Sequence, residues 1–301
     1  MDLSSARSEV KQILLRVRPA ELQELLKWIR TSDELDDFLS DNKTKILQNI
    51  SDDLRARLPL DAMLASETAA HGKMSQCSRP TVHVDGFLYD EDLVDSLCEE
   101  GTMSRSYCLN CGSTRTAPLD FISHSFSIPE LRFLFENVLP DLSGRLLVDV
   151  GSRLGAVLYG GHVFSSASQL VGVELSEEFV KLQRDIIQRY TLTDRIQVIH
   201  SDVCQQNVLL QNADVLIMNN VFEFFMEPSQ QVTAWRFIRE NFRKKGSLLV
   251  TVPSLQESLN PLQQEVLPLG WVEELPVDYD GFVGGDTDTD ALTQIHLYRV
   301  M

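Results

Sequence analysis

Apolar residues follow two different periods along the chain. In residues 1–57 they recur at helical spacing, first as Val10, Ile13, Leu14 and Val17, then as Leu22, Leu25, Leu26 and Ile29. Such spacing predicts amphipathic helices. Pro19 is expected to begin the second of them, because proline is tolerated in the first turn of a helix.

After residue 140 the pattern changes to short apolar runs separated by longer amphipathic segments. The runs at 146–150, 170–174, 196–202, 213–218 and 247–252 are rich in Val, Leu and Ile, which favours buried strands. One helix is predicted before these runs, at 128–138, and others between them, at 156–166, 176–190 and 230–242. Segments 271–277 and 294–300 are expected to form a final antiparallel pair. Strands that alternate with helices predict an α/β fold.

The change of pattern divides the chain into three predicted parts. Residues 1–57 form a helical accessory region, residues 58–127 a linker and small irregular subdomain, and residues 128–301 the α/β domain. The accessory helices either pack beside this domain or bind a partner. Residues 66–78 are small and polar, which is typical of a linker, although a lid over the substrate is the alternative.

Glycines and polar residues stand where the predicted strands end. The strand at 146–150 leads directly into Gly151, and a helix follows, as in a mononucleotide-binding crossover. Glu174 ends the second strand, 25 residues after Asp149, at the place where a carboxylate holds a ribose diol. Asp202 ends the third strand, and Asn219 and Asn220 follow the fourth. Because open α/β sheets bind ligands at these carboxyl ends, the residues are expected to form one crevice.

The stretches VDVGSRLGA, GVELS, IHSDV and ADVLIMNN resemble the class I S-adenosylmethionine-dependent methyltransferases. The resemblance covers roughly residues 128–301. It implies a Rossmann-like, doubly wound and mostly parallel seven-stranded sheet with a C-terminal antiparallel strand pair, to which this chain adds the N-terminal helical region. It also implies S-adenosyl-L-methionine as the cofactor.

The resemblance assigns roles to individual residues. Asp149, Gly151 and Gly155 would frame the methionine part of the cofactor, Glu174 would bind the ribose hydroxyls, and Asp202 the adenine amino group, with Val203 against the ring. Asn219 and Asn220 would face the sulfonium and the acceptor. The predicted cofactor set is completed by Ser152, Arg153 and Leu175. Arg153 replaces the third glycine usual in the first motif and would either narrow the pocket or add a cation beside a cationic cofactor.

The composition of the chain limits the chemical classes to which the methyl acceptor can belong. The net charge is −17, and almost all of the acidic excess follows residue 57, so the basic surface that nucleic acid requires is not expected. An acidic enzyme attracts cationic partners, and the Asn-Asn-x-Phe pattern is also similar to the non-SET histone lysine methyltransferases. These features favour a protein side-chain nitrogen as acceptor, with Asn219, Asn220 and Glu223 as catalytic residues. A small amine or carboxylate metabolite and a non-catalytic cofactor-binding scaffold are the alternatives, and Arg153 favours the scaffold.

Several smaller motifs have two interpretations each. Phe222, Phe224 and Phe225 either wall an acceptor channel or belong to the core. Cys108 and Cys111 form a Cys-x-x-Cys turn that is half of a zinc site, but no paired partner exists in the sequence, so no metal is predicted. A thioredoxin-type role is disfavoured because no strand is expected to lead into the pair.

The segment before the first strand carries both a cap and a possible cofactor contact. Ser127 and Glu130 have the spacing of a capping box, and Ser125 or Phe126 is a plausible cofactor neighbour. The acidic, Gly-rich stretch 278–290 lacks the ligand spacing of a calcium loop and is expected to be a solvated hairpin connection. With no apolar signal core at the N-terminus and no long apolar run, a cytoplasmic or nuclear protein is expected.

Overall fold

The computed structural model describes residues 3–58, 81–82, 85–101, 106–108, 116–118, 120–121, 125–222, 226–262, 270–279, 282 and 289–301. They divide into two compact units, residues 1–46 and residues 47–301. The first unit contains α1 (Leu3–Arg16), α2 (Pro19–Thr31) and the beginning of α3 (Asp33–Arg57). Pro19 begins α2, as predicted. The predicted boundaries after residues 57 and 127 stay predictions.

Between α3 and the main sheet lie short elements. They are β1 (Thr81–Val82), α5 (Glu91–Glu99), β2 (Ser106–Cys108), β3 (Thr116–Pro118) and β4 (Asp120–Phe121). β2 pairs antiparallel with β3, and β1 pairs parallel with β4. The expectation that no strand leads into Cys108 was therefore wrong: β2 ends at this residue, because β3 supplies a partner that the apolar pattern did not reveal.

The remaining elements alternate strands with helices, as the sequence predicts. The strands are β5 (Leu146–Val150), β6 (Gln169–Glu174), β7 (Ile196–His200), β8 (Val215–Asn219), β9 (Leu248–Val252), β10 (Val272–Leu275) and β11 (His296–Val300). The helices are α6 (Ile128–Phe133), α7 (Ala156–Phe164), α8 (Glu177–Arg189), α9 (Asn207–Asn212), α10 (Pro228–Asn241), α11 (Leu255–Leu259) and α12 (Thr289–Leu292). Three short helical turns join them: η1 (Leu134–Val138), η2 (Val203–Gln205) and η3 (Asn260–Leu262).

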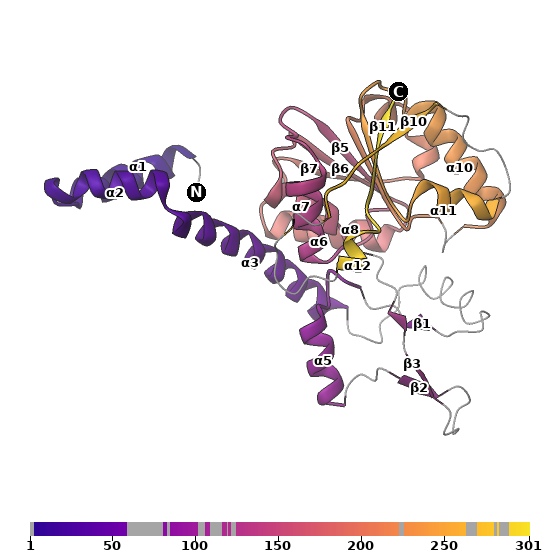
Figure 1. Ribbon diagram of the computed structural model, residues 1–301, viewed down its shortest axis with the longest axis horizontal. Coiled ribbons are helices and arrows are strands. Elements are labelled where there is room, and N and C mark those ends of the chain that lie inside the picture. The colour runs from indigo at the N-terminus through magenta and orange to yellow at the C-terminus, as the bar shows by residue number, and fades with distance from the viewer. Residues whose placement is uncertain are drawn as a thin grey trace. The chain divides into compact units, whose positions relative to one another are not determined.

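The main sheet has seven strands in the order β10-β11-β9-β8-β5-β6-β7. Pairing is parallel from β9 through β8, β5 and β6 to β7, whereas β11 runs antiparallel to both β9 and β10. The predicted Rossmann-like fold, including its C-terminal antiparallel pair, is confirmed. β5 lies between β6 and β8, so the chain leaves the centre of the sheet in both directions. Such a topological switch point is where doubly wound sheets bind ligands. Figure 1 shows helices on either side of this sheet, with α7 on one side and α10 on the other.

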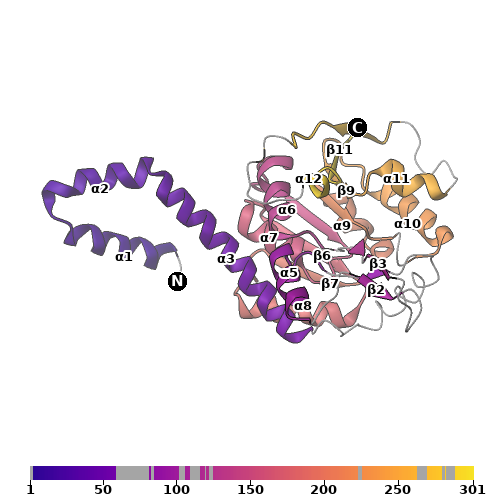
Figure 2. The same cartoon turned by 60° about the horizontal axis from the view of Figure 1, so that its bottom comes forward.

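Helices pack on both faces of the sheet and fix its central strands. On one face, Val148 and Val150 of β5 join Trp235 and Ile238 of α10 in the buried core. On the other face α7 lies against β6, and α8 against β6 and β7 (Figure 2). Gly172 of β6 makes this close approach possible, since a Cβ atom there would lie 2.6 Å from Ser152 Oγ and 2.8 Å from Leu158 Cδ1.

The start of the helix before β5 was predicted from the sequence, but its end was not. At its start, Ser127 and Glu130 form the predicted capping box, in which the Ser127 hydroxyl accepts from the Glu130 N–H and the Glu130 carboxylate accepts from the Ser127 N–H. Its end differs from the continuous helix predicted over 128–138, because the last turn, Leu134–Val138, widens into a π-helix. None of the helices in the described part of the chain has the length and hydrophobicity that a membrane span requires.

Candidate active site

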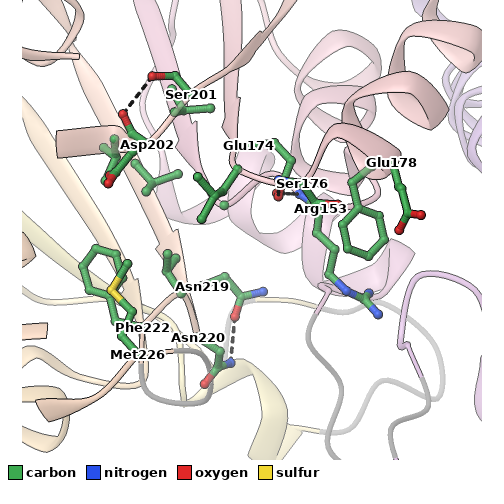
Figure 3. A pocket seen from close by; sticks show the side chains of 17 residues that line it. Arg153, Glu174, Ser176, Glu178, Ser201, Asp202, Asn219, Asn220, Phe222 and Met226 are labelled. Carbon is green, nitrogen blue, oxygen red and sulfur yellow. Dashed lines mark hydrogen bonds between the residues drawn. The ribbon is translucent and has the colours of Figure 1, made fainter. Parts of the chain in front are cut away.

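A cavity of about 530 Å³ opens at the carboxyl ends of β5, β6, β7 and β8 (Figure 3). Its volume lies within the range of about 300–1,000 Å³ that small-molecule sites occupy. The residues that line it come from the end of each of these strands, from the first turn of α8 and from the segment before α10 (Pro228–Asn241). They are Val150, Gly151, Arg153, Val173, Glu174, Leu175, Ser176, Glu178, Phe179, Ser201, Asp202, Val203, Asn219, Asn220, Val221, Phe222 and Met226.

The turn after β5 brings the backbone to the edge of the cavity. Gly151 adopts the left-handed conformation, with φ at 68°. Its N–H donates at 2.8 Å to the carbonyl of Val173 on the neighbouring strand β6. Gly155, also left-handed at φ 87°, is the N-cap of α7. A Cβ at Gly155 would lie 2.7 Å from the Tyr159 ring, so both the conformation and the space require glycine here.

Glu174 lies at the end of β6, with 8% of its surface exposed. One carboxylate oxygen accepts from the Arg153 N–H at 2.8 Å and the other from the Ser176 N–H at 2.7 Å. Burial raises the pKa of Glu174, and these backbone hydrogen bonds act in the opposite direction. Because each carboxylate oxygen can accept a second hydrogen bond, the fixed carboxylate retains acceptors for two hydroxyl groups of a ligand.

Asp202 and Ser201 form the wall of the cavity that follows β7. The Asp202 side chain accepts from the Cys204 N–H at 2.8 Å and thereby caps the turn η2. The Ser201 hydroxyl donates to the Asp202 carbonyl at 3.0 Å (Figure 3). Asp202 thus has a structural function, and its second carboxylate oxygen is the candidate acceptor for a ligand amino group.

Asn219 and Asn220 form a fixed pair of amides where β8 ends. The Asn220 side-chain amide donates to Asn219 Oδ1 at 2.9 Å (Figure 3), and the Asn220 N–H donates to the Val252 carbonyl at 2.7 Å. Asn220 is left-handed, with φ at 50°, a conformation that asparagine tolerates better than most residues. The strained backbone and the amide contact together orient both side chains at the cavity wall.

Asp149 is buried next to the cavity without lining it, and 4% of its surface is exposed. Burial raises the pKa of the Asp149 carboxyl well above its ordinary value, and the neighbouring Glu174 carboxylate raises it further. In the unfolded chain the group ionises near its ordinary pKa of 3.8, while the folded chain retains the proton to higher pH. The folded state therefore binds more protons in this interval, and its stability falls as pH rises above 3.8.

This linkage predicts that Asp149→Asn stabilises the protein without added ligand at neutral pH. The neutral amide avoids the cost of a buried acid, so we expect the Tm at pH 7.5 to rise by about 2–4 °C, the shift that 1 kcal/mol produces in a domain of this size. At pH 4 the difference should nearly vanish. Thermal unfolding at both pH values measures it, with Asp92→Asn on the exposed surface of α5 as control. A Tm that falls, or a shift equal at both pH values, would contradict the prediction.

The structure brings together most of the residues assigned from the sequence. Eight of them line the cavity: Gly151, Arg153, Glu174, Leu175, Asp202, Val203, Asn219 and Asn220. Ser152 does not line it, because its hydroxyl donates to Gln183 Oε1 of α8 at 3.0 Å. Gly155 is the cap of α7, and Glu223 lies outside the described residues, as do Phe224 and Phe225. Their roles in binding and catalysis stay predictions.

Phe222 and Ser125 illustrate side chains with two candidate roles. Phe222 is 1% exposed and packs edge-on against Trp235, with ring centroids 5.6 Å apart, yet it also borders the cavity. Ser125 does not line the cavity. Its hydroxyl donates to Asp85 at 2.7 Å, and its contact with the cofactor stays a prediction.

Residues that sequence reasoning missed come mostly from the start of α8 and from the loop after β8. Ser176, Glu178 and Phe179 line the cavity because α8 begins immediately after Glu174, and Met226 borders it from the segment before α10. Phe179 belongs to the first turn of the helix predicted at 176–190, directly after a strand that ends in an acid, and this position was the signal that could have identified it. Within the described ranges, no three His, Cys, Asp or Glu residues are grouped as metal ligands would be. Cys111 lies outside those ranges.

Comparison with known proteins agrees with this geometry. Residues 148–250 match the family model described as "Methyltransferase domain". This match runs from β5 to β9 and includes Glu174, Asp202, Asn219 and Asn220. None of the curated proteins matches the chain.

Solved structures with a similar fold include three whose names are informative. An RNA methyltransferase from Salinibacter ruber in complex with S-adenosyl-L-homocysteine is 15% identical, with 57% of this chain and 88% of that chain covered and a TM-score of 0.36. The [4+2]-cyclase SpnF is 19% identical, at 50% and 58% coverage and a TM-score of 0.36. TrmN from Thermus thermophilus is 12% identical, at 58% and 48% coverage and a TM-score of 0.40. TM-scores this low carry no argument about function. The assignment of a methyltransferase domain therefore rests on the family match and on the cavity.

Proposed function

Because this chain carries a class I S-adenosylmethionine-dependent methyltransferase domain, we propose that it methylates a nitrogen atom of a protein side chain by direct in-line transfer. The observation that carries the proposal is the fixed amide pair Asn219–Asn220 at the wall of an acidic cavity. The charged residues of the lining are Glu174, Glu178, Asp202 and Arg153. The one cation among them is paired with Asp85, so the lining favours cationic ligands.

The residues present fit the cofactor. A buried carboxylate with free acceptor sites at Glu174, a second acid at Asp202 across the cavity and a glycine turn at Gly151 match the chemistry of ribose, adenine and methionine groups. Glu174 would hold the ribose hydroxyls and Asp202 the adenine amino group. When bound, the cofactor supplies an electrophilic methyl group on a cationic sulfur.

The chain itself then has to position the acceptor and exclude water. In-line transfer requires the nucleophile, methyl carbon and sulfur to lie on one line, and such positioning removes several kcal/mol from a barrier. An amine attacks only when it is uncharged, so a group at the cavity wall has to orient it and accept its proton directly or through water. Asn219 and Asn220 would orient the amine, and the contact between their amides at the cavity wall supports this role.

Labelled-methyl transfer tests the acceptor class. The full-length protein is incubated with methyl-labelled S-adenosylmethionine and a cell lysate, and label is then counted in protein, RNA and small-molecule fractions. We expect label in protein, recovered after hydrolysis as an N-methylated basic amino acid. Label only in small molecules would replace the protein acceptor by a metabolite, and label in RNA would contradict the inference from charge. No label in any fraction, from protein that binds the cofactor, would contradict the proposal.

A further inference from the structure

Arg153 occupies the place in the glycine turn where the sequence pattern leads one to expect glycine. Its backbone is left-handed, with φ at 44°, and its N–H donates to Glu174. The residue lines the cavity, and its guanidinium lies over the Phe179 ring at 5.4 Å from the centroid. A cation is thus built into the wall of a site that would take a cationic cofactor, and the structure has to compensate for it.

Asp85 neutralises the charge of Arg153, although it lies outside residues 148–250, which match the family model. It is 6% exposed, and its Oδ2 forms an ion pair with the Arg153 guanidinium and accepts from the Ser125 hydroxyl at 2.7 Å. The other oxygen, Oδ1, accepts from the backbone N–H groups of Phe87 and Leu88 at 2.9 and 3.2 Å. Four donors therefore fix the carboxylate. This geometry leaves the carboxylate little freedom to move away from the guanidinium.

The turn that carries Asp85 is itself anchored to α3. The Ser51 hydroxyl donates to the Phe87 carbonyl at 2.9 Å, and Arg55 donates to the Leu88 carbonyl at 2.6 Å. Residues of α3 thus hold the turn, the turn holds Asp85, and Asp85 holds the side chain of Arg153. In Figure 3 the guanidinium points away from Asn219, Asn220 and Asp202. The ion pair is consistent with this direction.

We propose that Asp85 is a positioning residue of the cofactor site, which draws the Arg153 guanidinium aside and neutralises it so that the cavity accepts a sulfonium. This inference rests on the proposed assignment of the cavity to S-adenosylmethionine. A cation near the sulfonium would repel it, whereas the demethylated product, S-adenosylhomocysteine, has a neutral sulfur and is much less affected. The ratio of the two affinities therefore reports the charge beside the sulfur.

The test compares Asp85→Asn, Arg153→Gln and the double variant with the wild type. Calorimetric titration of each full-length protein with S-adenosylmethionine and S-adenosylhomocysteine gives both Kd values. Asp85→Asn leaves an uncompensated guanidinium. The affinity for S-adenosylmethionine should therefore fall about tenfold relative to the affinity for S-adenosylhomocysteine at low ionic strength. Arg153→Gln leaves an uncompensated carboxylate, which should shift the ratio in the opposite direction. The double variant should return it to the wild-type value.

The salt dependence of the affinity ratios separates this role from general destabilisation. The shifts should shrink when salt is raised from about 50 to 500 mM, since mobile ions screen charges. If Asp85→Asn does not fold, the opposite shift in Arg153→Gln still decides the matter. Ratios within about twofold of wild type in every folded single variant, measured at low salt, would overturn the inference. Failure of the wild type to bind either ligand would instead overturn the proposed site.

Discussion

Replacing Glu174 by alanine should weaken binding of both S-adenosylmethionine and S-adenosylhomocysteine at least tenfold. The carboxylate is buried at the centre of the cavity wall, and two backbone N–H groups hold its oxygens in place. A hydrogen bond to a charged acceptor is worth about 1.5–3 kcal/mol, and about 1.4 kcal/mol corresponds to a tenfold change in Kd. Because the ribose is common to both ligands, the two affinities should fall together. Calorimetric titration measures both.

The neighbouring Glu177→Ala is the matched control. Glu177 lies three residues away at the start of α8, pairs with Lys181 on the exposed surface and does not line the cavity. Its removal should leave both Kd values within about twofold, whereas Glu174→Gln, which keeps the shape of the side chain but not its charge, should be intermediate. Far-ultraviolet circular dichroism establishes that each variant is folded. An unchanged affinity in folded Glu174→Ala would remove this residue from the cofactor site.

Replacing Asn220 by glycine should lower kcat about 100-fold and leave the Kd of S-adenosylmethionine within about threefold. Glycine keeps the left-handed backbone, so the substitution removes only the amide that donates to Asn219. Without that contact neither amide is held at the position from which it would orient an acceptor amine, and loss of such positioning typically costs about two orders of magnitude. Steady-state methyl transfer to the protein fraction that carries label measures kcat.

Thr191→Gly provides the control for the backbone change. Thr191 is left-handed like Asn220, with φ at 58°, and follows α8 away from the cavity lining. Its replacement should leave turnover unchanged. If Asn220→Gly turned over like the wild type, the amide pair would have no catalytic role. If it lost cofactor affinity and turnover equally, Asn220 would belong to the cofactor site instead.

The sequence was sufficient for the sheet because each strand is an apolar run with its own termination signal. Glu174, for example, ends β6 and Asn219 ends β8, and parallel order places both ends at one edge. Local signals also located the Ser127 capping box. They did not reveal the π-helical turn of Leu134–Val138. The spacing of apolar residues predicts an α-helix and does not distinguish it from a single turn with the wider hydrogen bonding of a π-helix.

The site was predictable to the extent that its residues follow strands directly. Glu174 and Asn219 are the last residues of their strands, Gly151 follows β5 directly and Asp202 lies two residues after β7, and all four line the cavity. Asp85 could not be found in this way, because it belongs to no strand end and its partner lies 68 residues further along the chain. Arg153 was recognised as a departure from the family pattern, but its consequence depends on a contact between distant segments that spacing does not encode.

The dependence of Arg153 on an upstream counter-ion has a practical consequence for how this enzyme can be divided. A recombinant fragment trimmed to the recognisable domain, beginning near Leu146, would contain every strand of the main sheet but neither Asp85 nor the α3 residues that hold its turn. Such a truncation would expose an unneutralised cation to the sulfonium. On the proposal made for Asp85, a fragment that keeps the cofactor site intact begins within α3, well ahead of the residues that match the family model.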